Sequence, residues 1–365
     1  MELLQVQNKK DWEDFHKVPK IIYQQYPLWI EPLRADVEKA YQSLKDQNKP
    51  VGCWILKGSK GQLLGRICAS INNEENSGIS FFECVEDQKA ADLLFDVAEN
   101  FLKKQGVKHI DGPISLTERD KYWGLLTHGF DKPPVFQENY QPPYYLNFFK
   151  KRGYQELEKI YTLSAQTKDV PLERFKALAL RIKERYGYFV KGISKKNLLD
   201  SAKSITSVYN KAFESSPNFS PIQPEVVLDM LKEVSLFIDS RICCIAFDGH
   251  KPIGFCALLP DMNPFIKGLG GKLSHWRLPV FLGRFLCSRQ KTIKGVAFGI
   301  DPEYQSKGVY PLLVEYMGIP EVLEKYTRVF LATIRADNQL MVKTTMNLGV
   351  EIERIHYTFR KYNDI

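Results

Sequence analysis

The chain has 365 residues, of which 44% are hydrophobic and 26% charged, with a net charge of +8 and a pI near 8.9. These values are typical of a folded globular protein with room for two domains, and they exclude an intrinsically disordered chain. No apolar run approaches the length of about 18 residues that a membrane span needs, and the N-terminus lacks the apolar core of a secretory signal. The sequence therefore predicts a cytoplasmic protein with a mild bias toward anionic partners.

The first half of the chain alternates helical and strand-like stretches. Apolar residues at helical spacing predict two helices within residues 11–46, where Pro19 is expected to bend or split the first. The further elements expected here are strands at 53–56, 63–71, 79–85, 107–110 and 157–163 and helices at 90–104 and 144–151. Residues 111–143 are irregular, and an irregular stretch of this length is usually functional or covers another surface.

A polar stretch at residues 164–171 marks a boundary, after which the same order of elements returns. The helices expected in the second half are 172–186, 198–213, 224–238, one that begins at Pro311, and 338–348, and the strands are 188–193, 241–247, 253–259, 296–300, 328–334 and 352–361. The repeated order predicts a tandem duplication of one α/β unit, with domains at residues 1–165 and 166–365.

Most of the seven cysteines lie inside apolar runs: Cys53, Cys68, Cys243, Cys244 and Cys256. An odd number without metal-ligand spacing predicts buried free thiols in a reducing compartment. Histidine, cysteine and aspartate residues do not form a cluster with metal-ligand spacing, so no metal site is expected.

The most informative stretch is residues 296–315. An apolar, strand-like run ends at Asp301-Pro302, a polar loop with one glycine follows, and Pro311 stands where the first turn of a helix would begin. Proline is tolerated there because its missing N–H would have no partner within the helix. A strand, a tight loop and a helix N-terminus direct free backbone N–H groups and the positive end of the helix dipole at one spot. Such a junction suits a phosphate or pyrophosphate group.

This stretch resembles the acyl-CoA pyrophosphate loop of the GNAT acetyltransferase superfamily, whose pattern is Q-x-x-G-x-[G/A] after a strand. Gln305, Gly308 and the preceding Ile300-x-Pro302 match the pattern, whereas Tyr310 stands where the family usually has Gly or Ala. The resemblance covers nearly the whole chain in its order of elements. It implies an α/β (α+β) protein of two GNAT-like domains, each a mixed, mostly antiparallel sheet flanked by helices, the first domain being degenerate.

The resemblance also implies a cofactor, acetyl-CoA or another acyl-CoA, and a reaction in which an amine attacks the thioester directly. The residues that it assigns to the cofactor are Ile300, Gln305, Ser306, Lys307, Gly308, Val309, Tyr310 and Asn338. Asn338 followed by a helix and then Gly349 fits a second family pattern, although an asparagine that caps this helix needs no catalytic role.

Catalytic groups are harder to assign. The position where family members often carry a tyrosine acid is Thr345 here, and a threonine hydroxyl is too weak an acid to protonate a leaving thiolate. Tyr310 and Tyr357 are candidate acids by residue type alone. Asp261 and Asp301 are the carboxylates available as a general base, and Asp301 is interpreted as a residue of the local turn.

The loop of the first half that corresponds to the pyrophosphate loop, residues 86–89, has two carboxylates and no glycine. Carboxylates at a helix N-terminus satisfy the dipole themselves and would repel a pyrophosphate. The first domain is therefore predicted to be non-catalytic, with either a structural role or a role in shaping the substrate site.

An insertion at residues 263–294 separates a predicted hairpin from the central strand. It carries seven Lys or Arg residues and no acidic residue, with aromatic residues such as Trp276 and Phe281 between them. One interpretation is a helical flap whose basic side chains reach solvent. The other is a docking surface for the 3′-phosphate of CoA, an acidic carrier protein or an anionic membrane. No nucleic-acid recognition motif accompanies the insertion, so a nucleic acid is not expected.

Two functions remain open at this stage. The first is an acyl-CoA-dependent N-acyltransferase whose amine acceptor, a small molecule or a peptide, lies between the domains near residues 111–143. The second is a catalytically silent protein that retains the same fold and binds acyl-CoA or a partner. Gln305 and Gly308 favour the first function, and Thr345 and Tyr310 favour the second.

Overall fold

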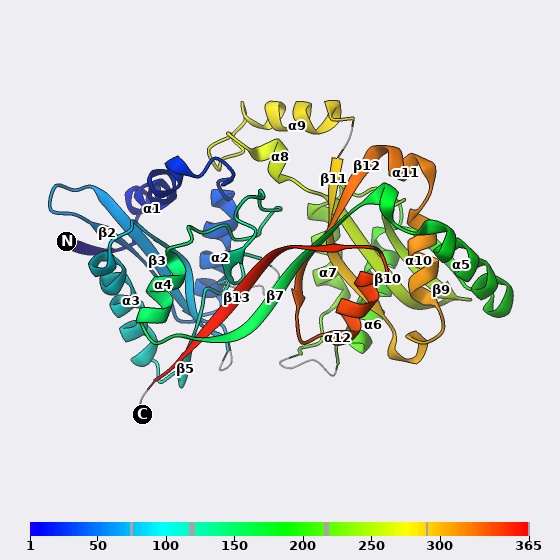
Figure 1. The fold of residues 1–365 in the computed structure, drawn as a ribbon, viewed down its shortest axis with the longest axis horizontal. Coiled ribbons are helices and arrows are strands. Elements are labelled where there is room, and N and C mark those ends of the chain that lie inside the picture. The colour runs from blue at the N-terminus through cyan, green and yellow to red at the C-terminus, as the bar shows by residue number, and fades with distance from the viewer. Residues whose placement is uncertain (74–75, 117–120, 215–218, 290, 364–365) are drawn as a thin grey trace.

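A computed structural model describes residues 1–365 apart from 74–75, 117–120, 215–218, 290 and 364–365. The described residues form one mixed sheet of thirteen strands with helices on both faces (Figure 1). The strands are β1 (Glu2–Gln5), β2 (Val51–Lys57), β3 (Leu63–Ile71), β4 (Ser77–Cys84), β5 (His109–Gly112), β6 (Leu125–His128), β7 (Gln155–Gln166), β8 (Phe189–Gly192), β9 (Cys243–Asp248), β10 (Lys251–Pro260), β11 (Lys291–Ile300), β12 (Tyr326–Arg335) and β13 (Glu351–Tyr362). The helices are α1 (Lys9–Ile22), α2 (Arg34–Asp46), α3 (Gln88–Lys103), α4 (Tyr145–Lys151), α5 (Leu172–Tyr186), α6 (Leu198–Phe213), α7 (Pro224–Glu233), α8 (Asn263–Ile266), α9 (Leu278–Cys287), α10 (Val309–Met317), α11 (Pro320–Lys325) and α12 (Gln339–Met346).

The two halves of the sheet exchange their last strands. The strand order is β1-β2-β3-β4-β5-β13-β7-β12-β11-β10-β9-β8, and β6 pairs with β13. The last strand of the chain, β13, pairs with β5 of the first half, with Phe359 opposite Gly112. The strand β7 ends the first half and pairs with β12 of the second, with Ala165 opposite Val329. The two sheets that the sequence predicts are therefore joined into one, and β7 and β13 cross the centre of Figure 1 side by side.

Each half of the sheet is covered on both faces. In the first half, α3 and α4 bury Leu94 and Phe149 against one face, and α1 and α2 bury Phe15 and Leu44 against the other. In the second half, α5 and α10 cover one face and α6 and α7 the other. The amphipathic patterns of these helices place their apolar stripes on the sheet. No helix of the described residues has the length and hydropathy that crossing a membrane requires.

Of the two expectations for Pro19, a bend or a split in the first helix, the split does not occur. Pro19 lies inside α1, which runs without a break from Lys9 to Ile22. Proline removes one intrahelical hydrogen bond, and the Pro19 ring is buried, which favours its place in the helix.

The expectation of free thiols holds for only part of the cysteines. Cys53 and Cys68 lie opposite each other across β2 and β3 and form a disulfide, because the strand register brings their side chains together. Cys243, Cys244 and Cys256 are free and buried, as predicted.

Candidate functional site

The two central strands of the second half diverge. β11 and β12 are parallel and paired up to Gly295, which lies opposite Leu331. Beyond this pair, β11 pairs with β10 and β12 with β7. Val296 forms a bulge on β11, and Thr333 of β12 has φ 60°, which a β-branched residue rarely adopts. Backbone strain of this kind concentrates at functional sites, so the opening between these strands is a candidate site.

The N-terminus of α10 lies just after the diverging end of β11. The residue before the helix, Gly308, has φ 80° and provides no capping side chain. No described residue accepts a hydrogen bond from the backbone N–H of Ser306, Gly308, Val309 or Tyr310. These N–H groups and the helix dipole together form an anion-binding concavity, as the sequence of this loop indicates.

The loop before α10 is held in place by contacts on both sides. A Cβ on Gly308 would lie 2.4 Å from Cδ1 of Ile182 in α5, so the loop packs directly against that helix. Within the loop, Gln305 N–H donates to the carbonyl of Pro302 at 3.4 Å, and Lys307 N–H donates to the carbonyl of Tyr304 at 3.0 Å. Of the five backbone amides of residues 305–309, two are thus used inside the loop.

Asp301 closes the end of β11, where Ile300 is the last residue. Its carboxylate accepts from Glu303 N–H at 3.1 Å and from Lys211 Nζ at 2.9 Å. Burial raises the pKa of Asp301, but Lys211 and the Glu303 amide outweigh burial and hold the pKa below its usual value. These contacts agree with the interpretation of Asp301 as a residue of the turn.

The equivalent helix of the first half has a different N-terminus. The carboxylate of Asp87 caps α3 by accepting from the N–H groups of Lys89 at 2.8 Å and Ala90 at 3.2 Å. A carboxylate therefore occupies the position that a phosphate would need, and its charge would repel one. This cap is the arrangement predicted from the acidic loop sequence.

Tyr310 does not face the free amides. Its ring packs against Phe175 and Phe298, and its hydroxyl donates to the carbonyl of Thr344 at 3.2 Å. Burial raises the pKa of Tyr310 well above its ordinary value. The bulky residue thus leaves the amides of the loop open, but its hydroxyl is poorly placed to donate a proton.

The remaining predicted site residues lie apart from one another. Asn338 caps α12 by accepting from Met341 N–H at 3.0 Å, which is the structural role weighed above. Tyr357 lies on β13 with its ring beside Lys159 and packs against the core of the first half. The structure does not bring Tyr357, Tyr310 and Asp261 together into one catalytic group.

Asp261 follows β10 and binds the irregular segment of the first half. Its carboxylate accepts from Phe136 N–H at 2.8 Å and from Asn263 N–H at 3.2 Å. Burial raises the pKa of Asp261 to about 6, even though both amides and the charge of Lys294 favour the ionised form. Asp261 thus joins the second half of the chain to the segment that covers the sheet.

The raised pKa of Asp261 predicts a pH-dependent stability difference. Between about pH 4 and pH 6, the folded protein binds a proton that the unfolded chain releases, so ionisation of this carboxyl costs folding free energy as the pH rises. Asp261→Asn keeps an oxygen acceptor for Phe136 N–H and has no charge. We expect its stability relative to wild type to rise by about 2 kcal/mol from pH 4 to pH 7 and to stay level above that. Urea unfolding across this range measures the difference, and parallel curves for both proteins would refute it.

A small cavity adjoins the opening between β11 and β12. It encloses about 10 Å³, and its lining residues come from six segments: Trp123, Gln137, Glu138, Ile160, Thr162, Lys294, Ala332, Thr333 and His356. This volume holds about one water molecule. A larger substrate group would therefore have to displace part of the lining, which includes the segment around Glu138.

His356 and Glu138 are the titratable groups of this cavity besides Lys294. His356 is buried, and its Nε2 lies 2.9 Å from the carbonyl oxygen of Asn139. Burial lowers the pKa of His356, so the ring is neutral at pH 7. A neutral ring that donates its Nε2 proton to Asn139 has an unprotonated Nδ1, and no described residue binds that nitrogen.

Glu138 is part of a buried ionic network. Its carboxylate accepts from Arg354 Nε at 2.6 Å, from Val135 N–H at 3.0 Å and from the hydroxyl of Thr162. Although burial alone would raise it, the charge of Arg354 holds the pKa of Glu138 below its usual value, together with the hydrogen bonds from Thr162 and Val135 N–H. The guanidinium of Arg354 is fully buried and also binds Glu353. The carboxylate of Glu138 is therefore occupied, which leaves His356 as the free base of the cavity.

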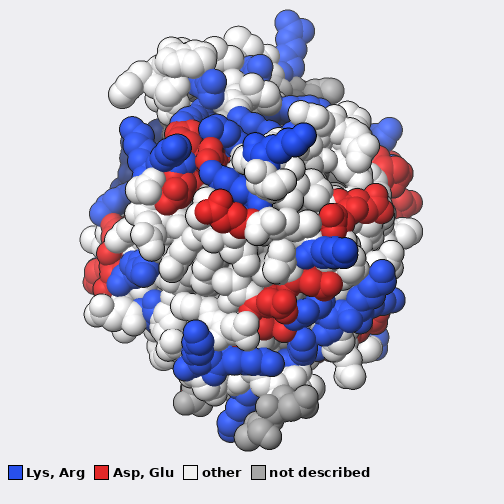
Figure 2. All heavy atoms as spheres, turned by 90° about the vertical axis from the view of Figure 1, so that its left-hand side faces the viewer, with Lys and Arg blue, Asp and Glu red and all other residues white. Residues whose placement is uncertain are grey.

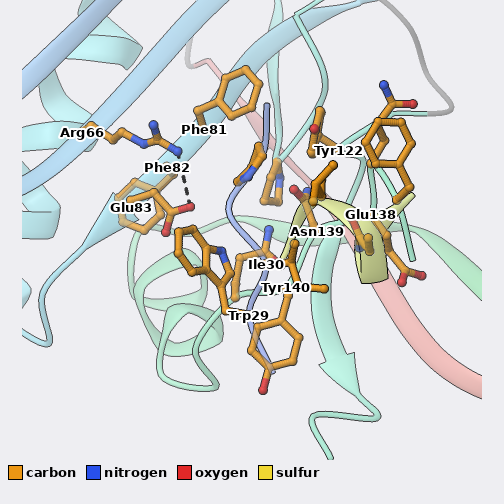
Figure 3. A pocket seen from close by; sticks show the side chains of 17 residues that line it. Trp29, Ile30, Arg66, Phe81, Phe82, Glu83, Tyr122, Glu138, Asn139 and Tyr140 are labelled. Carbon is orange, nitrogen blue, oxygen red and sulfur yellow. Dashed lines mark ion pairs between the residues drawn. The ribbon is translucent and has the colours of Figure 1, made fainter. Parts of the chain in front are cut away.

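A second cavity lies at the equivalent opening of the first half, where β4 diverges from β5 (Figure 3). It encloses about 40 Å³, and its lining combines six aromatic residues with polar side chains and the ion pair of Arg66 and Glu83, whose closest atoms are 3.8 Å apart. Phe81, on a bulge of β4, has φ 47°. Residues 136–141 and Ile266 of α8 also line it, so one irregular segment borders both cavities.

Sequence reasoning missed Glu138, Lys294 and His356 as parts of one site. A signal is present in β13, where Arg354, His356 and Thr358 alternate along a strand and all face the interior. Buried polar residues at period two indicate a polar site on one face of a sheet. Among the described residues, no group of three or more His, Cys, Asp or Glu side chains is arranged to hold a metal ion.

Comparisons with known proteins agree with this architecture. No family model matches the chain. Among curated proteins, it is 23% identical over 368 residues to Protein YghO of Escherichia coli (strain K12), with 97% of this chain and 93% of that protein covered. It is 22% identical over 320 residues to a bacterial ceramide synthase of Caulobacter vibrioides, with 84% of this chain and 82% of that protein covered.

Solved structures show the fold. A GCN5-related N-acetyltransferase from Sphaerobacter thermophilus superposes with a TM-score of 0.55 at 10% identity, over all of this chain and 97% of that one. A tandem GNAT protein from the clavulanic acid biosynthesis pathway superposes with a TM-score of 0.56 at 9% identity, over 99% and 98%. The glucosamine N-acetyltransferase region of a fungal β-N-acetylglucosaminidase superposes with a TM-score of 0.59 at 12% identity, and the chain spans 38% of that longer protein. This chain has the fold of the GNAT N-acetyltransferase superfamily, in its tandem form.

Proposed function

We propose that this protein is an acyl-CoA-dependent N-acyltransferase whose cofactor site lies in the second half. The observation that carries the proposal is the contrast between the two halves. The N-terminus of α10 has free amides and lies beside diverging strands, whereas a carboxylate closes the N-terminus of α3. Of the two duplicated units, residues 166–365 would thus bind the cofactor, and residues 1–165 would shape the acceptor side.

The residues of the α10 loop fit the pyrophosphate of CoA. The amides of Ser306, Gly308 and Val309 would bind its oxygens, and Lys307 would add positive charge, while Gln305 and Ile300 shape the approach. Bound acyl-CoA supplies a thioester whose carbonyl carbon is open to an amine. The opening between β11 and β12 would admit this end of the cofactor, because the strands there leave backbone groups unpaired.

We further propose that His356 accepts the proton that the acceptor amine loses. The imidazole borders the same small cavity as Thr333 of the diverging strand, and no residue that the structure describes binds its Nδ1. In the transfer, the amine nitrogen bonds to the carbonyl carbon, the bond to sulfur breaks, and the amine proton passes to Nδ1. Asp261 would position Phe136 and the cavity lining instead of reacting.

This role predicts a selective kinetic effect. His356→Gln keeps a donor for the carbonyl of Asn139 and removes the basic nitrogen. We expect kcat to fall about 100-fold with CoA affinity unchanged. The wild-type rate should also fall below the pKa of this histidine, which lies under the usual 6.5, because only the neutral ring accepts a proton. His109→Gln, on β5, is the matched control, and a kcat within twofold of wild type for His356→Gln would eliminate this base.

The acceptor that we propose is a long-chain amine. A ceramide is the amide of a fatty acid and a long-chain amino alcohol, and the likeness to a bacterial ceramide synthase extends over 84% of this chain. The aromatic residues that line part of the cavity of Figure 3, among them Phe136 and Tyr140, offer apolar surface beside the proposed site. The acyl group would then be a fatty acyl chain or, as in the N-acetyltransferases of this fold, an acetyl group.

A specific observation favours a second candidate function, that of a silent acyl-CoA- or partner-binding protein. The hydroxyl of Tyr310 is engaged by Thr344, and Thr345 donates to the carbonyls of Met341 or Val342 within its own helix. Neither group is free to protonate a departing thiolate. In this case the protein would bind CoA and release no product.

Calorimetric titration of CoA, followed by a transfer assay, separates the two functions. The assay mixes acetyl-CoA or a long-chain acyl-CoA with a long-chain amine and measures free thiol and the amide product. Saturable binding with thiol release that depends on the amine supports the acyltransferase. Binding without release supports the silent acyl-CoA-binding protein, and no heat at millimolar CoA would refute both roles that need CoA and leave only partner binding.

A further inference from the structure

The helix α9 shows an apolar face to solvent. Its exposed residues are uncharged apart from Arg284, which donates to the carbonyl of Lys267; among them, Val280 is 44% exposed and Leu286 is 73% exposed. Its inward side packs through Phe281 and Phe285 against Phe237. A surface helix normally turns charged or polar residues outward, and a helix that is apolar on all sides normally lies in a core or a membrane. The outer face of α9 is therefore exposed to water although its composition suits an apolar environment.

The apolar surface continues into the chain before the helix. Trp276 is 69% exposed, and Leu273 and Leu278 are also exposed. The guanidinium of Arg277 lies 4.5 Å from the centre of the Trp276 ring. Tryptophan is enriched where protein meets the headgroup region of a bilayer, and arginine can extend its apolar stem along apolar surface while its charged end stays in water.

Cations surround this apolar surface. Residues 263–294 contain seven Lys or Arg residues and no carboxylate. Lys267 and Arg289 are exposed, and neither forms an ion pair with a described residue. The ridge that α9 forms at the top of Figure 1 appears at the top of Figure 2 as uncharged side chains with Lys and Arg around and beneath them. The surface thus combines apolar groups with an unneutralised positive charge.

The ridge, which consists of α9 and the chain that precedes it, is attached to both halves of the molecule. The carbonyl of Gly271 accepts from Arg34 N–H at 2.8 Å, and Lys272 binds Glu13 at 2.7 Å, both in the first half. The amide of Asn263 donates to the carbonyl of Pro134 at 2.8 Å, next to the segment that borders both cavities. The ridge is therefore a rigid, projecting feature that stands over the junction of the two halves.

We propose that residues 267–289, with α9 at their centre, dock the protein on the surface of an anionic lipid bilayer. The exposed aliphatic side chains and Trp276 would enter the boundary between headgroups and acyl chains, and Lys267 and Arg289 would bind the anionic headgroups. A projecting ridge of apolar side chains suits a bilayer, which deforms around it. An acidic carrier protein would match the cations and would leave these apolar side chains in water.

Co-sedimentation of the protein with lipid vesicles, carried out without CoA, tests the proposal. We expect the protein to sediment with phosphatidylcholine vesicles that contain 30% phosphatidylglycerol and to bind pure phosphatidylcholine at least tenfold more weakly. The double variant Val280→Asp/Leu286→Asp should lose at least tenfold in partition to the anionic vesicles. Leu199→Asp replaces an apolar side chain of α6 that is 51% exposed, and it should bind as wild type does.

A second double variant tests the contribution of the basic side chains to vesicle binding. Lys267→Glu/Arg289→Glu should weaken binding about tenfold or more at low salt and should remove most of its salt dependence. Circular dichroism and the unfolding midpoint of each variant establish that it is folded. Failure of the wild type to bind anionic vesicles, or equal binding by the Val280→Asp/Leu286→Asp variant, would overturn the proposal. Because CoA and transfer assays need no vesicles, this outcome is independent of the proposed function.

Discussion

Replacing Ser306 with aspartate is expected to weaken CoA binding by at least tenfold. Ser306 is exposed and lies beside the free amides of Gly308 and Val309. A carboxylate there would bind those amides itself and repel the pyrophosphate, as Asp87 does at the N-terminus of α3. A tenfold change corresponds to about 1.4 kcal/mol, within the range of charge effects at a helix terminus. Calorimetric titration of CoA measures the difference.

Ser306→Ala is the matched control, since it shortens the side chain without adding charge, and its affinity should equal that of wild type. A substitution at Gly308 is less informative. A side chain there would adopt φ 80° and meet Ile182 at 2.4 Å, so Gly308→Asp would combine strain with charge. If Ser306→Asp bound CoA as tightly as Ser306→Ala, the pyrophosphate would lie elsewhere.

Arg354→Met is expected to lower the free energy of unfolding by about 3–5 kcal/mol. The fully buried guanidinium binds Glu138 at 2.6 Å and Glu353 at 3.1 Å. Methionine fills a similar volume and leaves Glu138 buried with its charge uncompensated. Urea unfolding at pH 7 measures the loss, which should shrink at low pH because protonated Glu138 no longer needs a cation.

Lys39→Met is the control for this variant. Lys39 pairs with Glu233 across the two halves at 3.1 Å, but both side chains are largely exposed, so we expect a loss below about 1 kcal/mol. A similar loss in both variants would mean that the buried network adds nothing beyond an ordinary surface pair.

The sequence predicts most elements of this fold and misses how the two halves join. Apolar periodicity along each segment is local information, and it places α5 and α6 with the bounds that the structure shows. Strand exchange depends on which strands pair, and Phe359 and Gly112 are far apart in sequence. The alternation within β13 is the same for either partner, so it cannot reveal the exchange.

The candidate site likewise has one part that local sequence predicts and one part that only the fold reveals. The loop at residues 305–309 is contiguous, and its glycine, its proline and the strand before it predict a helix N-terminus with free amides. The acceptor side combines Glu138, Lys294 and His356, which come from three separate segments. Each of these residues looks ordinary in its own sequence context, and only the fold brings them to one cavity. The disulfide of Cys53 and Cys68 was missed for the same reason, because it depends on strand register.

The exchanged strand also affects how this protein is made. During synthesis, residues 109–112 leave the ribosome long before residues 359–362, which pair with them. At about 5–20 residues per second, the intervening chain takes on the order of 10–50 seconds to synthesise. Throughout that interval, the first half presents an open strand edge and an incomplete core that lacks Phe359. Nascent chains of this protein are therefore expected to depend on chaperones until the last residues have been added.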